Sequence, residues 1–209
     1  LSLGQSGGFE DVLFRALQVP VARGDRYAVA GFLRQWVRDR GVQLIEIGTA
    51  AGNARMFRGE DLPESELAWL REHLAWGELV VPARFVSPEL PLIAVPDREA
   101  QLKARLETDE ARKRMAGAAL SLARAFTQRI DASVSARLYV NLDNPAIQAL
   151  LQSHREGRAV PAHAVALLRS FKAIMAPGGE ELKGQPPLVE LLADFSRAVA
   201  ALCAPRSAS

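Results

Sequence analysis

The sequence predicts a mixed fold, in which a small α/β unit over residues 1 to about 60 precedes an α+β part over residues 61–209. Glycine and proline divide the chain into three regions with different hydrophobic periods. Helical and strand-like runs alternate in the first region, extended runs flank a long helical stretch in the second, and the third is helical throughout. We therefore expect the α+β part to contain a three-stranded sheet, a long helix and a C-terminal helix pair.

The first region pairs two predicted helices with two predicted strands. Apolar residues recur at helical spacing over residues 9–18 and 27–39, and Gly41 is placed to end the second helix. Residues 19–22 and 42–47 are short extended runs. Because the order helix, strand, helix, strand provides a crossover connection, we expect the two strands to be parallel.

The second region begins after a loop over residues 48–59, which has no strong period. The run Asp-Leu-Pro-Glu that starts at Asp61 predicts a helix N-terminus, with Asp61 as the capping residue. Two extended runs follow, over residues 79–87 and 90–95. They supply the first two strands of the expected sheet.

A long helix is predicted over residues 97–128, and residues 136–142 form the third strand. The turn Asn-Leu-Asp-Asn-Pro over residues 141–145 then offers an Asn or Asp side chain to cap a helix that starts near Ala146. Large apolar residues are sparse among charges in the first half of the long helix, so it cannot bury that face well. Beside an ordinary solvated helix, this predicts a partner-binding stripe of Leu102, Leu106 and Met115.

The third region consists of two predicted helices, over residues 160–176 and 188–203. In the second helix, apolar residues repeat every 3.5 residues, as in a seam between packed helices, and Val189 and Leu191 widen that face beyond one neighbour. A second copy of the chain would cover the remainder in a dimeric four-helix bundle. The residues expected at this dimer interface are Leu168, Phe171, Met175, Leu188, Leu191, Leu192, Phe195, Val199 and Leu202.

Composition excludes several classes of protein. The longest apolar runs of the 209 residues are far shorter than the roughly 20 residues of a membrane-spanning helix. Twenty-six Lys and Arg against 24 Asp and Glu are too balanced for a nucleic-acid-binding surface. A lone cysteine, Cys203, excludes an intrachain disulfide and indicates a reducing compartment. The chain opens with Leu1, from which we expect a piece of a longer protein.

No catalytic constellation is expected, and the three histidines lie at no metal-ligand spacing, so no metal site is expected either. The competing interpretation is a small-molecule or nucleotide-binding α/β domain of an enzyme. It would use the loops after Val21 and Ile47, because such sheets bind ligands at the carboxyl ends of their strands.

Residues 136–147, Ala-Arg-Leu-Tyr-Val-Asn-Leu-Asp-Asn-Pro-Ala-Ile, resemble the C-terminal domain of the ninety-kilodalton heat-shock chaperone family, where a strand ends in Asn-x-Asp-x-Pro before a helix. Residues 84–97 resemble its paired strands, and residues 167–176 and 182–202 its last two helices. Upstream, residues 16–47 resemble the α/β subdomain that ends its middle domain. The resemblance covers nearly the whole chain.

The resemblance implies a C-terminal fragment of a dimeric, ATP-dependent chaperone that acts on unfolded or partly folded client proteins in the cytoplasm. Residues 1–60 would end the middle domain, and residues 61–209 would be the dimerisation domain, with Leu102, Leu106 and Met115 in the client surface. ATP and magnesium would be bound by the parent protein and not by this fragment. The chain ends in Arg-Ser-Ala-Ser, without the family's acidic tail peptide, which favours the bacterial type.

Overall fold

The computed structural model describes residues 9–22, 24, 29–98, 100, 103, 134–175 and 184–203. Its centre is a four-stranded mixed sheet in the order β1-β2-β4-β3. The central pair is parallel, β2 beside β4, whereas β3 is antiparallel to β4 and β1 is antiparallel to β2. The strands are β1 (Arg58–Gly59), β2 (Leu79–Arg84), β3 (Leu92–Pro96) and β4 (Ala136–Asn141).

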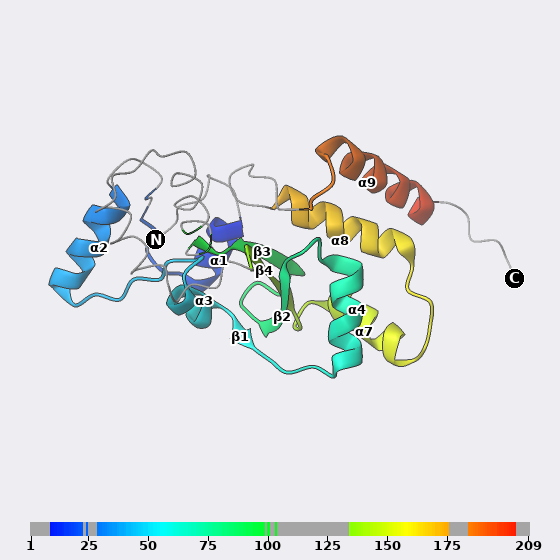
Figure 1. Cartoon of the computed structure of the whole chain (residues 1–209), viewed down its shortest axis with the longest axis horizontal. Helices are drawn as coiled ribbons and strands as arrows, with labels where there is room; N and C mark the ends of the chain where they lie inside the picture. The colour runs from blue at the N-terminus through cyan, green and yellow to red at the C-terminus, as the bar shows by residue number, and fades with distance from the viewer. Residues whose placement is uncertain are drawn as a thin grey trace, which may run out of the picture.

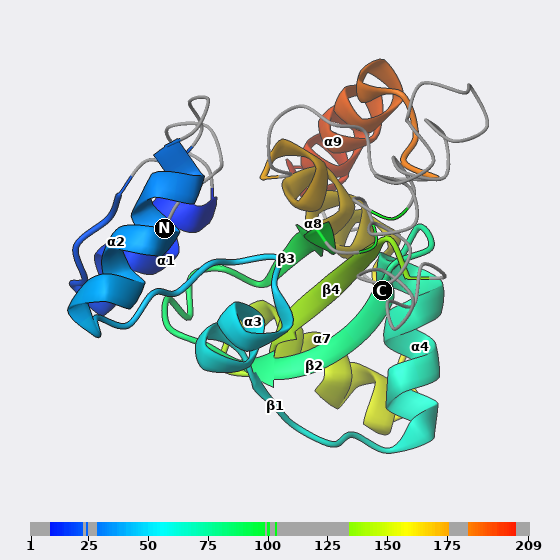
Figure 2. The same ribbon diagram turned by 60° about the vertical axis from the view of Figure 1, so that its left-hand side comes forward.

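Helices cover both faces of this sheet, and α3 and α7 lie on opposite sides of it (Figures 1 and 2). Side chains alternate along β4, so that Leu138 and Val140 join one hydrophobic cluster while Tyr139 joins the other. The described helices are α1 (Phe9–Leu17), α2 (Val29–Arg40), α3 (Ala50–Met56), α4 (Glu64–Leu74), α7 (Pro145–Arg155), α8 (Ala162–Ile174) and α9 (Leu188–Cys203).

The first cluster lies between the sheet and helices α4, α7 and α8, with Leu70, Leu138 and Ile147 fully buried in it. The second lies between the other face of the sheet and helices α1 and α3, and Phe9 and Ile93 are buried there. This second cluster joins residues from both sides of position 60, where the sequence places a domain boundary. Helices α1 and α3 therefore share a core with the sheet.

The parallel strand pair expected in the first sixty residues is wrong. Neither residues 19–22 nor residues 42–47 form a strand. Ile47 is buried in the second cluster as predicted for a strand, but Glu46 between its apolar neighbours is buried as well, through ion pairs with Arg34 and Arg98. The alternating pattern thus belongs to an extended connection packed on the core.

The expected loop over residues 48–59 instead contains α3 and β1, which makes the sheet four-stranded where three strands were expected. Thr49 caps α3, because its side-chain oxygen accepts a hydrogen bond from the Gly52 amide at 3.1 Å. β1 then pairs with β2, with Arg58 opposite Arg84. Local capping and one long-range pairing define these short elements, so hydrophobic periodicity could not detect them.

Helices α1, α2, α4, α7, α8 and α9 confirm the helical predictions within a few residues at each end. The cap predicted at Asp61 is wrong, because α4 begins after Pro63 without a side-chain cap. The cap before α7 is confirmed: Asn144 accepts hydrogen bonds from the amides of Ala146 and Ile147. Most of the long helix predicted over residues 97–128 lies outside the described residues.

Candidate functional site

The C-terminal helix α9 lies on α8, on the side away from the sheet (Figure 1). Few of its described side chains face inward: Leu191 and Ala198 are the two hydrophobic ones among them that are buried. Ser170 of α8 donates a hydrogen bond to the Leu191 carbonyl at 3.2 Å, so the two helices are also joined by a polar contact. Among the described residues, one edge of α9 therefore contacts the rest of the molecule, and most of the helix's described side chains are exposed.

The open side of α9 is strongly apolar. Leu192 is 50% exposed and Val189 is 73% exposed, although both are large aliphatic residues in a regular helix. A continuous exposed apolar face of this kind marks an interaction surface more often than an isolated exposed leucine does. We define the α9 face as Val189, Leu192, Phe195, Val199 and Leu202.

The structure divides the nine residues that the sequence places at a dimer interface into separate groups. Leu192, Phe195, Val199 and Leu202 are exposed on the α9 face. Leu168 and Leu191 are already buried within the single chain, and Phe171 and Met175 are half-buried against its core. The remaining one, Leu188, begins α9, and its side chain lies outside the described ones.

Helix α8, which carries α9, is fixed to the C-terminus of α4 by two basic side chains. Arg169 donates to the carbonyl of His73 at 2.6 Å and to that of Glu72 at 3.3 Å. Lys172 donates to the carbonyl of Leu74 at 2.7 Å. The last carbonyls of a helix have no partner inside it and lie at the negative end of its dipole. Two cationic side chains of α8 therefore supply the hydrogen-bond donors that the last carbonyls of α4 lack.

Lys172 also forms an ion pair in the interior. Its Nζ lies 2.8 Å from the Glu78 carboxylate and 3.5 Å from the centre of the Trp76 ring, and the side chain is fully buried. Burial lowers the pKa of Lys172 to about 8, although the Glu78 carboxylate acts in the opposite direction. The hydrophobic pattern alone does not predict this anchor; its signal in the sequence is that Lys172 follows Val165 and Leu168 at inward-facing helical spacing.

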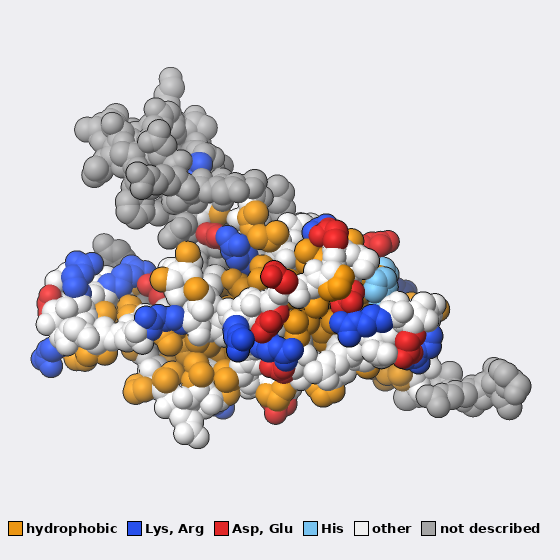
Figure 3. Space-filling view, turned by 90° about the horizontal axis from the view of Figure 1, so that it is seen from below, with side chains coloured by type: hydrophobic (Ala, Val, Ile, Leu, Met, Phe, Trp, Pro, Cys, Tyr) orange, Lys and Arg blue, Asp and Glu red, His pale blue; other side chains and the backbone are white. Residues whose placement is uncertain are grey.

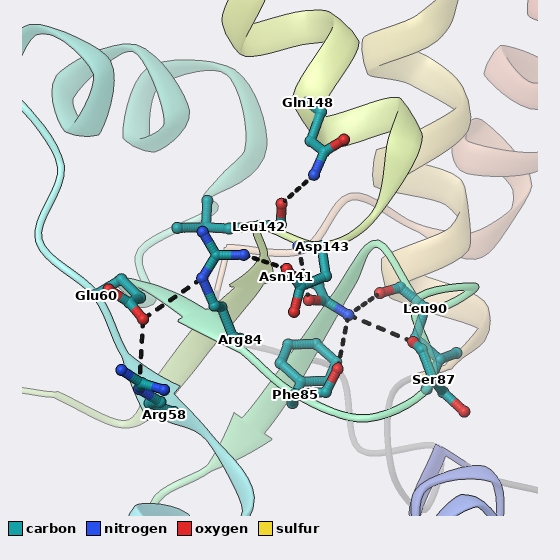
Figure 4. A network of polar contacts seen from close by, with 10 residues as sticks. All are labelled: Arg58, Glu60, Arg84, Phe85, Ser87, Leu90, Asn141, Leu142, Asp143 and Gln148. Atoms are coloured by element: carbon teal, nitrogen blue, oxygen red, sulfur yellow. Dashed lines mark hydrogen bonds and ion pairs between the residues drawn. The ribbon is translucent and has the colours of Figure 1, made fainter.

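The turn that carries the family resemblance is centred on Asn141, which is completely buried (Figure 4). Its Nδ2 lies within 3.3 Å of the carbonyl oxygens of Phe85, Ser87 and Leu90, and its Oδ1 accepts from the Asp143 amide at 3.1 Å. One side chain thus joins the end of β4 to the connection between β2 and β3.

Two neighbours of Asn141 extend this network. Asn144, which caps α7, also donates to the Pro88 carbonyl at 2.6 Å. On the surface, Arg84 contacts Asp143 and lies 3.4 Å from Glu60, which in turn pairs with Arg58 of β1 (Figure 4). Each described polar contact of this turn therefore stabilises the fold, so the turn's residue pattern is explained without catalytic chemistry.

The loop that the ligand-binding interpretation places after residues 42–47 is closed by its own contacts. Asn53 accepts a hydrogen bond from the Gly48 amide at 2.9 Å. A Cβ atom on Gly52 would lie 1.8 Å from the Glu46 carbonyl oxygen, so backbone fills the adjacent space. Because no described strand leads into this loop, the strand-end geometry on which that interpretation rests is wrong.

Glu46, just before this loop, is the buried centre of a second ionic group, whose arginines are partly exposed. Its carboxylate accepts two hydrogen bonds from Arg34 of α2, at 3.0 and 2.5 Å, and one from Arg98 at 3.0 Å. Burial alone would raise the pKa of Glu46, but the hydrogen bonds and charges of the two arginines outweigh it and hold that pKa below its ordinary value. This group ties α2 to the body of the molecule.

The predicted client-contacting residues Leu102, Leu106 and Met115 lie outside the described residues. Within the described part of the chain, no group of three or more His, Cys, Asp or Glu side chains is placed to hold a metal ion. Over the same part, every helix is too short or too polar to cross a membrane.

Comparisons with protein-family models, with curated proteins and with solved structures find no match to this chain.

Proposed function

We propose that this chain is a homodimerisation module in which the α9 faces of two copies pack together across a twofold axis. The observation that carries the proposal is the α9 face itself, a row of large apolar side chains on a helix that the described part of the chain covers along one edge only. With α8 beneath each α9, the natural assembly is a four-helix bundle.

The chemistry of the face suits a symmetric partner. The central residues Leu192, Phe195 and Val199 are uncharged, and the charged neighbours Asp194 and Arg197 pair with each other on the same helix. Burying each large apolar side chain is worth about 1.5–3 kcal/mol. Five of them therefore contribute at most about 7–15 kcal/mol, which is of the same order as the association cost of about 4–15 kcal/mol.

The proposal extends to a role in protein folding. On the resemblance of the ordered motifs, the module would join two subunits of an ATP-dependent chaperone of the ninety-kilodalton heat-shock family, located in the cytoplasm. Clients would contact Leu102, Leu106 and Met115, while ATP and magnesium would be bound by another part of the parent protein.

Light scattering of the purified chain tests the dimer. At tens of micromolar we expect about twice the chain mass of 22.7 kDa, and Phe195→Asp should reduce it to the mass of one chain because two copies of the charge would face each other in the interface. As a matched control, Phe32→Asp places the same charge at an exposed phenylalanine of α2 and should leave the mass unchanged. A native mass near that of one chain contradicts the proposal.

Whether the dimer belongs to a chaperone requires a separate measurement. The native chain should slow the aggregation of a thermally unfolded model protein, and serine in place of both Leu102 and Leu106 should remove that effect without lowering the melting temperature. Equal protection by the native chain and this double variant would contradict the client surface and leave the dimer intact.

A further inference from the structure

The four residues before α9 form a stiff connection to the rest of the molecule. They read Gly-Gln-Pro-Pro over residues 184–187, and the amide of Glu190, in the first turn of α9, donates to the Pro187 carbonyl at 2.9 Å. Each proline fixes its own φ angle and also restricts the residue before it. A displacement of Gly184 is therefore passed on to the start of α9.

Gly184 lies against Trp76, in the loop between α4 and β2. A Cβ atom on Gly184 would lie 2.3 Å from the Trp76 carbonyl oxygen, so a larger residue does not fit without moving this backbone. The φ angle of Gly184 is +82°, in the left-handed region that favours glycine. Two separate features thus require glycine where the connection to α9 contacts the body of the molecule.

Trp76 is in turn held by the buried ion pair at α8. Its ring lies over the Lys172 amine, with Nζ 3.5 Å from the ring centre, and its backbone amide donates to Oε2 of Glu78 at 2.5 Å. The other carboxylate oxygen of Glu78, Oε1, accepts from Lys172 at 2.8 Å. The ion pair therefore fixes both the ring and the backbone of Trp76.

Along its length, α9 is held by its packing on α8. Leu191 and Ala198 are buried there, and Ser170 bonds to the Leu191 carbonyl. The contact at Gly184 adds a restraint at the start of the helix, which sets how far along α8 the uncharged α9 face lies. The underside of the molecule, away from α9, has basic and acidic side chains among hydrophobic ones (Figure 3).

We propose that Trp76 and Gly184 position α9 for homodimerisation, so that the buried pair Lys172–Glu78 determines the strength of the dimer from a distance. This role rests on the proposed function, because it acts on the dimer through the α9 face, to which none of these residues belongs. A twofold axis repeats every displacement in the partner, so an error in the position of α9 enters the interface twice.

Light scattering over a concentration series, which yields the dimer dissociation constant, tests this role. Gly184→Ala should raise that constant at least about tenfold, because the new methyl group displaces the connection from Trp76. Gly157→Ala is the matched control, since Gly157 also has a positive φ angle, +66°, but has open space around its Cβ position. It introduces the same kind of backbone strain and should leave the dissociation constant unchanged.

The same two changes in the monomeric Phe195→Asp background separate the position of α9 from the stability of the dimer. In that background, Gly184→Ala and Gly157→Ala should lower the melting temperature by similar amounts. Hydrogen exchange should become faster in α9 for Gly184→Ala alone, because only that change disturbs the start of the helix.

The ion pair supplies a readout that a purely structural role would not change. Lys172→Met with Glu78→Leu should keep most of the native stability, because apolar side chains replace the ions. The double variant nevertheless loses the amine beneath the Trp76 ring and the carboxylate at its amide. We therefore expect a folded chain whose dimer dissociation constant is raised about tenfold.

Variants of Trp76 itself check the part played by its ring. Trp76→Leu removes the aromatic face over the Lys172 amine and should weaken the dimer, whereas Trp76→Phe keeps such a face and should restore most of the native affinity. Equal affinities of these two variants would contradict a role for the ring.

Three results would overturn the positioning role while the native chain remains a dimer. They are an unchanged dissociation constant in Gly184→Ala, the same rise in Gly157→Ala, or native dimerisation of Lys172→Met with Glu78→Leu. A native chain with the mass of one copy is a different outcome, because it contradicts the proposed dimer itself and with it this role.

Discussion

Helices α2 and α8 are both attached to the body of the molecule by ion pairs, but water reaches the two attachments to different degrees. At α8, Lys172 and Glu78 are both almost completely inaccessible. At α2, Glu46 is buried but the side chain of Arg34 is about half exposed. The α8 pair is supported by packed apolar residues such as Val165 and Leu168, whereas α2 buries none. An exposed ion pair can orient a helix, but a buried one is costly to break.

The largest expected effect is from Lys172→Met. This change leaves the Glu78 carboxylate in the interior without its cation, and it removes a donor from the end of α4. Urea unfolding should show a loss of about 3–5 kcal/mol in the free energy of unfolding.

The double variant Lys172→Met with Glu78→Leu should recover most of that loss, since an apolar pair of similar size replaces the ions. If Lys172→Met were as stable as the native chain, the buried ion pair at α8 would be no more costly to break than the exposed one at α2, and the comparison would be wrong.

The pH dependence of the same pair sharpens the comparison. The pKa of Lys172 is about 8 in the folded chain against 10.5 ordinarily, so between these values the unfolded chain binds more protons. The free energy of unfolding should therefore rise with pH across this window, by on the order of 3 kcal/mol. Urea unfolding at several pH values should show this rise for the native chain and not for Lys172→Met. Parallel curves for the two proteins would contradict the lowered pKa.

A smaller effect is expected from Arg34→Met. Because the Arg34 side chain is about half exposed, and Arg98 still contacts Glu46, the loss of global stability should be about 1 kcal/mol or less. Hydrogen exchange should nevertheless become faster throughout α2 and stay unchanged in α8. If hydrogen exchange in α2 of Arg34→Met were as slow as in the native chain, contacts other than the Arg34–Glu46 pair would hold this helix.

The smallest effect is expected in acid. The pKa of Glu46 lies below its ordinary value of 4.5, so its contribution is present above that value and is lost as the pH falls through the folded pKa. Melting temperatures of the native chain and of Glu46→Gln, measured from neutral pH downward, should therefore converge at low pH. If the difference in melting temperature between the native chain and Glu46→Gln stayed constant down to low pH, the ionised Glu46 carboxylate would not stabilise the fold as proposed.

The sequence predicts those elements whose signal is local. Helix α9 follows from a sustained apolar repeat, and α7 follows from Asn144 and Pro145 at its start. The strand expected over residues 42–47 is wrong because the arginines that pair with Glu46 lie 12 residues before it and 52 residues after it. Alternation alone does not distinguish a strand from an extended segment held by such distant side chains.

For the candidate site, too, the sequence predicts the local pattern but not which residues the folded chain covers. Periodicity found the apolar residues of α9 but could not decide which of them its own chain would cover, so Leu191 was placed in the interface although α8 and α9 bury it. Phe32 and Trp36 belong to the helical apolar period over residues 27–39, which cannot reveal their exposure, because that depends on how few residues α2 buries. Lys172 has no local signal that separates it from a solvated lysine except its spacing.

The strand order of the sheet has a consequence for how the chain is made. Strands β2 and β3 do not pair with each other; both pair with β4, which begins at Ala136, long after β3 ends at Pro96. During synthesis from the N-terminus, β2 and β3 leave the ribosome before β4 does. The strand edges that pair with β4 in the folded protein therefore stay unpaired until β4 has been made. A chain cut before Ala136 leaves the β4-pairing edges of both strands open, so we expect such a nascent or proteolysed fragment to aggregate.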